Sequence, residues 1–329
     1  MTGLIGRFTR IVSSFGLLLQ FINPAFSSDY PNRAINVLIP FATGGATQAL
    51  SERVGRWVGA DLGQPLVSDH RGGAGGTIAA QAAARAVPDG YTIFMGATGA
   101  LAVAPAVMSK VNFDPVKDFI PIALIATTPY VVVVGARSPF KTILELVEYA
   151  RQHPGKLNFA SSGTAGADHI AGEVWQQNMQ FKMTHVPYKG AGPYLPDLIV
   201  GRIDVAIISP IPVKSLVEAG EVRILAVTTA QRSQAPHLKD IPTVNESGGT
   251  GYDFPAWYGY FAPAKTPAEV VEKLHVSVLK ALKDPAIKEW LIAQGLTSGD
   301  LSANGFGQLL RAEVKKWSTF ATILNIHVE

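Results

Sequence analysis

The chain of 329 residues contains no cysteine. This absence excludes disulfide bonds, thiolate metal sites and cysteine nucleophiles together. It is compatible with an oxidising compartment but does not require one, because a large core needs no covalent cross-links. Charged residues are also scarce, at 16%, against 47% hydrophobic residues. That composition excludes intrinsic disorder, and the length suits two domains of ordinary size.

The motifs of nucleotide binding and of hydrolysis are missing as well. The sequence has no P-loop, no dinucleotide-binding glycine fingerprint and no nucleophile elbow. Its net charge is +3 and its basic residues are scattered, so nothing indicates a nucleic-acid surface. The seven histidines are dispersed, and the adjacent pair Asp168 and His169 is better explained by a helix start and by packing. We therefore expect no metal and no cofactor.

A serine nucleophile is the one catalytic role that the sequence suggests. Ser161 and Ser162 lie close before His169. The helical register after Gly166 gives His169 no reason to meet a serine hydroxyl, and nothing resembles a paired general acid and base. The sequence therefore predicts no catalytic residue.

The N-terminus has the pattern of an export signal. Arg7 and Arg10 precede an apolar stretch at residues 11–22, and small residues follow at 24–28. A membrane anchor or a buried first helix is the alternative. The stretch is short and interrupted by polar residues, whereas a membrane span needs about 20 apolar residues. We therefore predict a signal peptide over residues 1–28 and export of the remaining chain.

Short β-branched runs alternate with segments of helical period over most of the chain. This alternation predicts an α/β fold with open, doubly wound parallel sheets. The run of valines at 131–134 is apolar on both faces, as expected for a parallel strand covered by helices. Caps at Thr266 and Asp284 open two C-terminal helices, and a last helix spans 306–323. The predicted strands are 34–39, 91–95, 120–126, 130–134, 157–160, 204–209, 222–228 and 257–262, and helices are predicted at 47–62 and 77–87.

Glycine-rich turns follow several of the predicted strands, at residues 40–47, 96–99 and 161–169. In open α/β sheets ligands bind outside the carboxyl ends of the strands, and helix N-termini there favour anions. Each turn alone could owe its glycines to local geometry. The three turns together, each with Thr or Ser beside the glycine, favour an anion site, whereas the turn at 71–77 is interpreted as mostly structural.

Two further segments leave alternatives open. Tyr188 and Lys189, in a rigid turn, could reach a ligand or could simply close a surface loop. The aromatic cluster at 257–261 is better explained by core packing than by ligand contact.

Many short motifs, in order over nearly the whole chain, resemble the Bug family of solute-binding proteins, the receptors of tripartite tricarboxylate transport systems. No single motif is decisive, but the ordered set is specific. The motifs that carry the resemblance lie at residues 40–47, 71–76, 88–92, 118–119, 160–169, 186–190, 226–228, 241–244 and 262–267.

The resemblance implies a type II periplasmic binding protein fold of the Venus-flytrap kind, without enzymatic activity. It also implies a periplasmic monomer that clasps a small carboxylate between two lobes and passes it to membrane transporter subunits. One lobe would comprise residues 29–130 and 253–329, and the other residues 131–252. The ligand-binding residues implied by position are Thr43, Gly44, Gly45, Ala46, Thr47, Gln48, Thr98, Gly99, Ser162, Gly163, Thr164, Ala165, Gly166, His169, Tyr188, Lys189 and Ser209.

Two positions depart from the family pattern. Gln48 stands where relatives usually carry Asp, and Ser209 lies in a segment where many carry Asp or Asn. Both changes remove negative charge, so we expect di- or tricarboxylates, other plain acids or aromatic acids rather than amino acids. Two other roles remain open at this stage: a ligand-sensing partner of a membrane sensor kinase and, less favoured, an enzyme on the same architecture.

Overall fold

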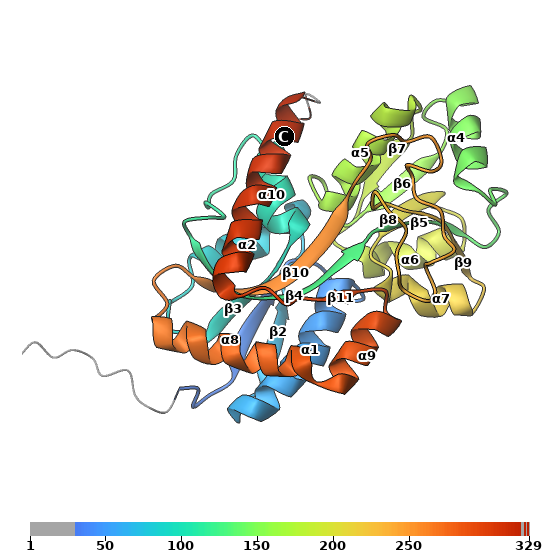
Figure 1. The fold of residues 1–329 in the computed structure, drawn as a ribbon. Coiled ribbons are helices and arrows are strands. Elements are labelled where there is room, and N and C mark those ends of the chain that lie inside the picture. The colour runs from blue at the N-terminus through green and yellow to red at the C-terminus, as the bar shows by residue number, and fades with distance from the viewer. Residues whose placement is uncertain (1–29, 324–325, 327, 329) are drawn as a thin grey trace, which may run out of the picture. The chain divides into compact units, whose positions relative to one another are not determined.

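The computed structural model describes residues 30–323, 326 and 328, which are organised around two β-sheets (Figure 1). The predicted signal peptide at residues 1–28 lies outside the described residues. Pro31–Glu329 forms one compact unit that contains both sheets. Among the helices that the structure describes, none is long and apolar enough to cross a membrane.

The first sheet has six strands: β1 (Ile35–Ile39), β2 (Leu66–His70), β3 (Thr92–Ala97), β4 (Phe119–Pro129), β10 (Pro255–Pro263) and β11 (Thr297–Ser298). Their order is β11-β4-β10-β3-β1-β2. β1 pairs in parallel with β2 and β3, whereas β10 is antiparallel to both β3 and β4. This sheet is therefore mixed.

The second sheet has five strands: β5 (Val131–Gly135), β6 (Asn158–Ser161), β7 (Thr184–Pro187), β8 (Val205–Ile208) and β9 (Val222–Val227). Their order is β7-β6-β8-β5-β9. We call the part of the chain that carries the first sheet the first lobe, and the part that carries the second sheet the second lobe. Strands of the first sheet come from residues 35–129 and 255–298, and those of the second from residues 131–227. The limits of the lobes given above stay a prediction.

The expectation of purely parallel sheets is wrong. The valines of β5 are fully buried, as predicted, yet β5 pairs antiparallel with both β8 and β9. A strand that is apolar on both faces is covered on both faces, but this pattern does not predict whether it pairs in parallel or antiparallel. β5 follows β4 after Tyr130 alone and belongs to the other sheet, where its neighbours are β8 and β9.

Helices cover both faces of the sheets. In the first lobe α1 and α8 lie on one face and α2 and α10 on the other (Figure 1). Short helical turns occur at Ala74–Gly76, Gly99–Val103 and Ile211–Val213. The helices are α1 (Ala46–Leu62), α2 (Thr77–Ala84), α3 (Ala104–Val107), α4 (Ile143–Gln152), α5 (Ala167–Met179), α6 (Ala191–Ile199), α7 (Lys214–Glu218), α8 (Ala268–Lys283), α9 (Pro285–Ala293) and α10 (Ala303–Ile323).

The strands predicted from the sequence are all present, with limits shifted by a few residues. β2, β7 and β11 have no counterpart among these predicted ranges. β2 lies at the edge of its sheet with half-exposed side chains, and it includes the exposed Val67 and the polar Asp69. A strand of this kind lacks the apolar alternation on which sequence recognition depends.

The two predicted helix caps have different outcomes. Asp284 caps α9, and its carboxylate accepts a hydrogen bond from the Ala286 backbone N–H at 2.8 Å, as predicted. The predicted cap at Thr266 is wrong, because α8 has Pro267 at its N-cap position. The Thr266 hydroxyl instead donates to the Pro263 carbonyl at 2.8 Å, which satisfies it within the preceding turn.

Candidate functional site

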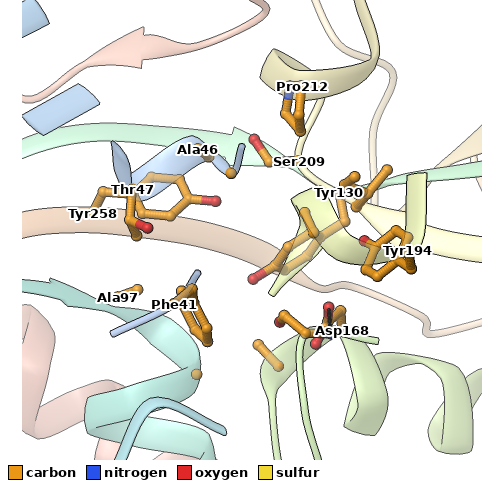
Figure 2. A pocket seen from close by; sticks show the side chains of 16 residues that line it. Phe41, Ala46, Thr47, Ala97, Tyr130, Asp168, Tyr194, Ser209, Pro212 and Tyr258 are labelled. Atoms are coloured by element: carbon orange, nitrogen blue, oxygen red, sulfur yellow. Dashed lines mark hydrogen bonds between the residues drawn. The ribbon is translucent and has the colours of Figure 1, made fainter. Parts of the chain in front are cut away.

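A cavity of about 40 Å³ lies between the two lobes, where β1, β3, β6 and β8 end (Figure 2). This is the place at which open α/β sheets bind ligands. The small volume shows that the lobes stand close together around it. The cavity is lined by Phe41, Gly45, Ala46, Thr47, Ala97, Gly99, Tyr130, Ser162, Ala167, Asp168, Ala191, Tyr194, Ile208, Ser209, Pro212 and Tyr258.

Three helices begin at the wall of the cavity. Ala46 opens α1, Ala167 opens α5 and Ala191 opens α6, and all three alanines line the cavity. The N-cap of each helix is a glycine, which has no side chain to accept hydrogen bonds from the first turn. The first N–H groups of a helix have no partner within the helix and carry partial positive charge. The backbone of this cavity therefore suits an anion.

Hydroxyl groups supply most of the polar side-chain surface. The hydroxyls of Thr47 and Tyr194 are buried and have no hydrogen-bond partner among the described residues. Tyr130 and Tyr258 also direct their hydroxyl ends toward the cavity (Figure 2). A buried hydroxyl without a partner costs about 1–3 kcal/mol, so the arrangement is complete only when something polar occupies the space.

One acidic side chain lines the cavity. Asp168 is 4% exposed, and its carboxylate accepts backbone hydrogen bonds from Ser162 at 2.6 Å and from His169 at 3.0 Å. Burial raises the pKa of Asp168 from 3.8 to about 6, although these hydrogen bonds act in the opposite direction. The lining residues include no Lys, Arg or His. The cavity wall therefore contains an acid, although Gln48 and Ser209 stand where relatives often carry one.

The structure brings only part of the sequence-predicted set to the cavity wall. The predicted residues that line the cavity are Gly45, Ala46, Thr47, Gly99, Ser162 and Ser209. The predicted residues that do not line it are Thr43, Gly44, Gln48, Thr98, Gly163, Thr164, Ala165, Gly166, His169, Tyr188 and Lys189.

Several residues of the second group have other contacts. The exposed Gln48 side chain accepts a hydrogen bond from the Gly44 backbone N–H at 2.6 Å. The Thr98 hydroxyl accepts from the Trp257 N–H at 2.8 Å and ties β3 to β10. The Tyr188 hydroxyl donates to Asp197 at 2.8 Å. The replacement of an acid by Gln48 therefore does not change the charge of the cavity itself.

Sequence reasoning missed Asp168 and the three tyrosines of the wall. Tyr258 belongs to the aromatic cluster that was attributed to the core. Its neighbour Trp257 does pack against Phe306 in the core, whereas Tyr258 lines the cavity. Side chains alternate between the two faces of a strand, and that alternation is the signal that separates the two residues.

Glycines of the two lobes meet beside the cavity, and we call Gly44, Gly72, Gly75, Gly163, Gly190 and Gly192 the interlobe glycines. A Cβ atom on Gly192 would overlap the Thr43 carbonyl oxygen, and a Cβ atom on Gly75 would lie 2.9 Å from the Thr164 carbonyl oxygen. Side chains at these positions would hold the lobes apart. The turn at 71–77, interpreted as structural, therefore forms part of the contact between the lobes.

A serine–histidine pair exists, but with a different histidine from the one considered in the sequence. The Ser161 hydroxyl lies 2.6 Å from Nε2 of His185, whose ring stacks on His169 at 3.8 Å. Burial lowers the pKa of His185 to about 4. Burial, and then the proximity of His185, lowers the pKa of His169 to about 3. Ser161 is fully buried and does not line the cavity, so this pair packs β6 against β7 and α5.

No cluster of three or more metal-ligating side chains occurs in the part of the chain that the structure describes.

Comparison with known proteins gives consistent matches over most of the chain. Residues 53–326 match the model of the tripartite tricarboxylate transporter family receptor. A protein encoded in the tcbD–tcbE intergenic region of Pseudomonas sp. (strain P51) is 36% identical over 289 residues, which are 88% of this chain and 85% of that protein.

Solved structures match as well. A structure described as a periplasmic transporter is 36% identical, with a TM-score of 0.87 over 91% of this chain and 100% of the other. The R. palustris protein Rpa4515, with adipate, is 34% identical, with a TM-score of 0.86 over 91% and 99% of the two chains. MatC from Rhodopseudomonas palustris, with bound malate, is 30% identical, with a TM-score of 0.84 over 88% and 99%.

Proposed function

Because the chain belongs to the tripartite tricarboxylate transporter receptor family, we propose that it binds a small organic carboxylate between its lobes and delivers it to the membrane subunits of such a transporter. The family consists of periplasmic solute-binding receptors rather than enzymes, and the two mixed sheets are those of the type II periplasmic binding protein fold. Adipate and malate, the acids in the two R. palustris structures, support a carboxylate ligand for this chain.

The observation that carries the proposal is that α1 and α6 begin at the wall of one buried cavity without a side-chain cap. Ala46 and Ala191, the first residues of these two helices, line the cavity, and no basic side chain is present among the lining residues. Such a site holds an anion by backbone dipoles and hydroxyls rather than by an ion pair. A carboxylate of a few carbon atoms would also contact the apolar side chains of Phe41 and Ile208.

Binding would be coupled to closure of the lobes. The residues proposed to hold the ligand come from both lobes: Thr47 and Gly99 from the first, Ser162 and Ser209 from the second. A ligand that bridges the lobes stabilises the closed form by its differential affinity for that form. Export to the periplasm through residues 1–28 and action as a monomer complete the proposed function.

The experiment is a thermal-shift screen of the protein purified from the periplasm against a library of carboxylic acids, including aromatic acids. We expect at least one acid to give a saturable stabilisation of about 2.7 kcal/mol at a hundredfold excess over its Kd. Matched amides of the same acids are the control, because they keep the shape and lose the charge. The proposal is wrong if no acid stabilises the protein, or if the amides stabilise it equally.

A further inference from the structure

The cavity differs chemically between its two sides. The start of α1, with Ala46 and Thr47, comes from the first lobe, and Asp168 comes from the second lobe, across the cavity (Figure 2). The first side offers backbone N–H groups and the positive end of a helix of 17 residues. The second side offers a carboxyl group at the start of α5, which offsets the positive end of that helix. An anionic ligand is therefore favoured at one side and opposed at the other.

The charge of Asp168 is not neutralised by any nearby cation. His169 is adjacent to it on α5, and burial keeps both His169 and its stacked partner His185 neutral at pH 7 by lowering the pKa of each ring. The titratable groups around this side of the cavity are His169 and Glu173 on α5, His185 on β7, Tyr130 between the sheets, Tyr194 on α6 and Tyr258 on β10. None of these groups carries a positive charge at pH 7.

Asp168 still has capacity to accept hydrogen bonds. Each oxygen of an ionised carboxylate has two lone pairs, and in Asp168 each oxygen accepts one backbone N–H, while the Ser162 hydroxyl also hydrogen-bonds to the carboxylate. The Tyr194 hydroxyl, fully buried in the same wall, has no hydrogen-bond partner. A second carboxylate of the ligand placed here would face an ionised acid in a cavity without a cation. A hydroxyl or ammonium group placed here would donate to that acid instead.

We infer that Asp168 is a specificity-determining residue that accepts a hydrogen bond from the ligand, so that the receptor selects carboxylates bearing a hydroxyl or ammonium group over those without a donor. The inference rests on the proposed function. It differs from the expectation raised by Gln48 and Ser209, because the relevant acid is Asp168, which comes from α5.

The test is calorimetric titration with acids that share a carbon skeleton and differ in the donor. The probes are succinate with malate and aspartate, propionate with lactate and alanine, and benzoate with 4-hydroxybenzoate. We expect the wild-type protein to bind a donor-bearing acid at least tenfold more tightly than its donor-free partner. Asp168→Asn should reduce this preference at least tenfold, whereas Asp240→Asn, at an exposed position of the second lobe, should leave it unchanged.

Measuring the affinities at several pH values distinguishes two roles of Asp168: accepting a hydrogen bond from the ligand, or only supporting the structure. The preference of the wild-type protein should decrease between pH 7.5 and pH 5, as Asp168 gains a proton, and that of Asp168→Asn should stay constant. The inference would be overturned if both acids of a pair bound with equal affinity. It would also be overturned if the donor-free acid bound more tightly and the protein took up a proton on binding. In both cases the protein would still be a carboxylate receptor. Failure of every probe to bind, while another acid of the library binds, overturns the inference alone. Failure of the whole library removes the proposed function as well.

Discussion

The backbone N–H of Ala42 donates a hydrogen bond to the carbonyl of Lys189 at 2.9 Å and joins the two lobes directly. Ala42 follows β1 in the first lobe, and Lys189 follows β7 in the second. On either side of this bond the interlobe glycines place backbone against backbone. A Cβ atom on Gly72 would lie 2.6 Å from the same Lys189 oxygen. The contact beside the cavity thus depends on the absence of side chains.

Gly192→Ala should therefore weaken ligand binding without damaging the fold. The added Cβ would overlap the Thr43 carbonyl oxygen of the other lobe, and its nearest contacts all lie in that lobe. Within α6 alanine is a better helix former than glycine, so the second lobe itself should not lose stability. We expect Kd for a carboxylate to rise at least tenfold, because the binding-competent closed form becomes less populated.

The measurement is calorimetry together with small-angle scattering, which reports whether ligand still closes the lobes. Gly305→Ala is the control, because its Cβ would meet neighbours only at 3.4 Å or more, within the chain segment that begins α10. An unchanged Kd in Gly192→Ala would show that closure does not need this contact.

Tyr194→Phe should stabilise the protein in the absence of ligand. The Tyr194 hydroxyl is buried without a hydrogen-bond partner, and removal of such a group relieves about 1 kcal/mol of desolvation penalty. Tyr252→Phe is the matched control of opposite sign, because the buried Tyr252 hydroxyl donates to the Ala171 carbonyl at 2.9 Å. Urea unfolding of both variants measures the effect, and a loss of stability in Tyr194→Phe would contradict the prediction.

Relative to the wild type, Asp168→Asn should be more stable at pH 7.5 than at pH 4. Burial raises the pKa of Asp168 to about 6 in the folded protein, against 3.8 for the unconstrained group, so the folded state binds the proton more tightly than the unfolded state. Protonation of Asp168 therefore contributes to the free energy of unfolding. This contribution is fully present below about pH 4 and is lost as the pH rises through about 6. We expect the stability of the variant relative to the wild type to be about 1–3 kcal/mol higher at pH 7.5 than near pH 4, on top of a pH-independent cost, because the amide nitrogen of Asn cannot accept one of the two backbone N–H groups. Urea unfolding at several pH values checks this, and a difference between the two proteins that does not change with pH would exclude the charge as its cause.

The histidine pair should make the protein less stable as the pH falls. Burial lowers the pKa of His185 to about 4 and that of His169 to about 3, so between pH 6.5 and these values the unfolded state binds more protons. Stability therefore decreases below about pH 6.5, and Asp168 offsets part of the loss below about pH 6. We expect a net loss of about 2 kcal/mol between pH 7.5 and pH 5, and a steeper loss in Asp168→Asn. Stability that stays constant over this range would contradict the prediction.

The sequence by itself determined most of the segments that become strands, several of the helices and the glycine-rich turns that follow the strands. Apolar periodicity and turn residues act over a few positions of the chain, so the run at 131–134 reads correctly as a buried strand and Asp284 as a helix cap. The glycine-rich turns at strand ends also indicated the edge of the sheets at which the cavity lies, because parallel strands of one sheet end at the same edge.

Only the tertiary structure decided the direction of β5 and the composition of the cavity. The packing of the two lobes against each other decides that Gly45 faces the cavity and that Gly192 contacts the other lobe. No local sequence pattern encodes this packing. In the sequence, Asp168 has the features of an ordinary residue at the start of a helix. Its place in the cavity wall follows only from the packing of α5 beside β8 and across from α1. Its raised pKa arises from burial by segments far apart in the sequence, and for this reason the acid of the cavity could be found only in the folded chain.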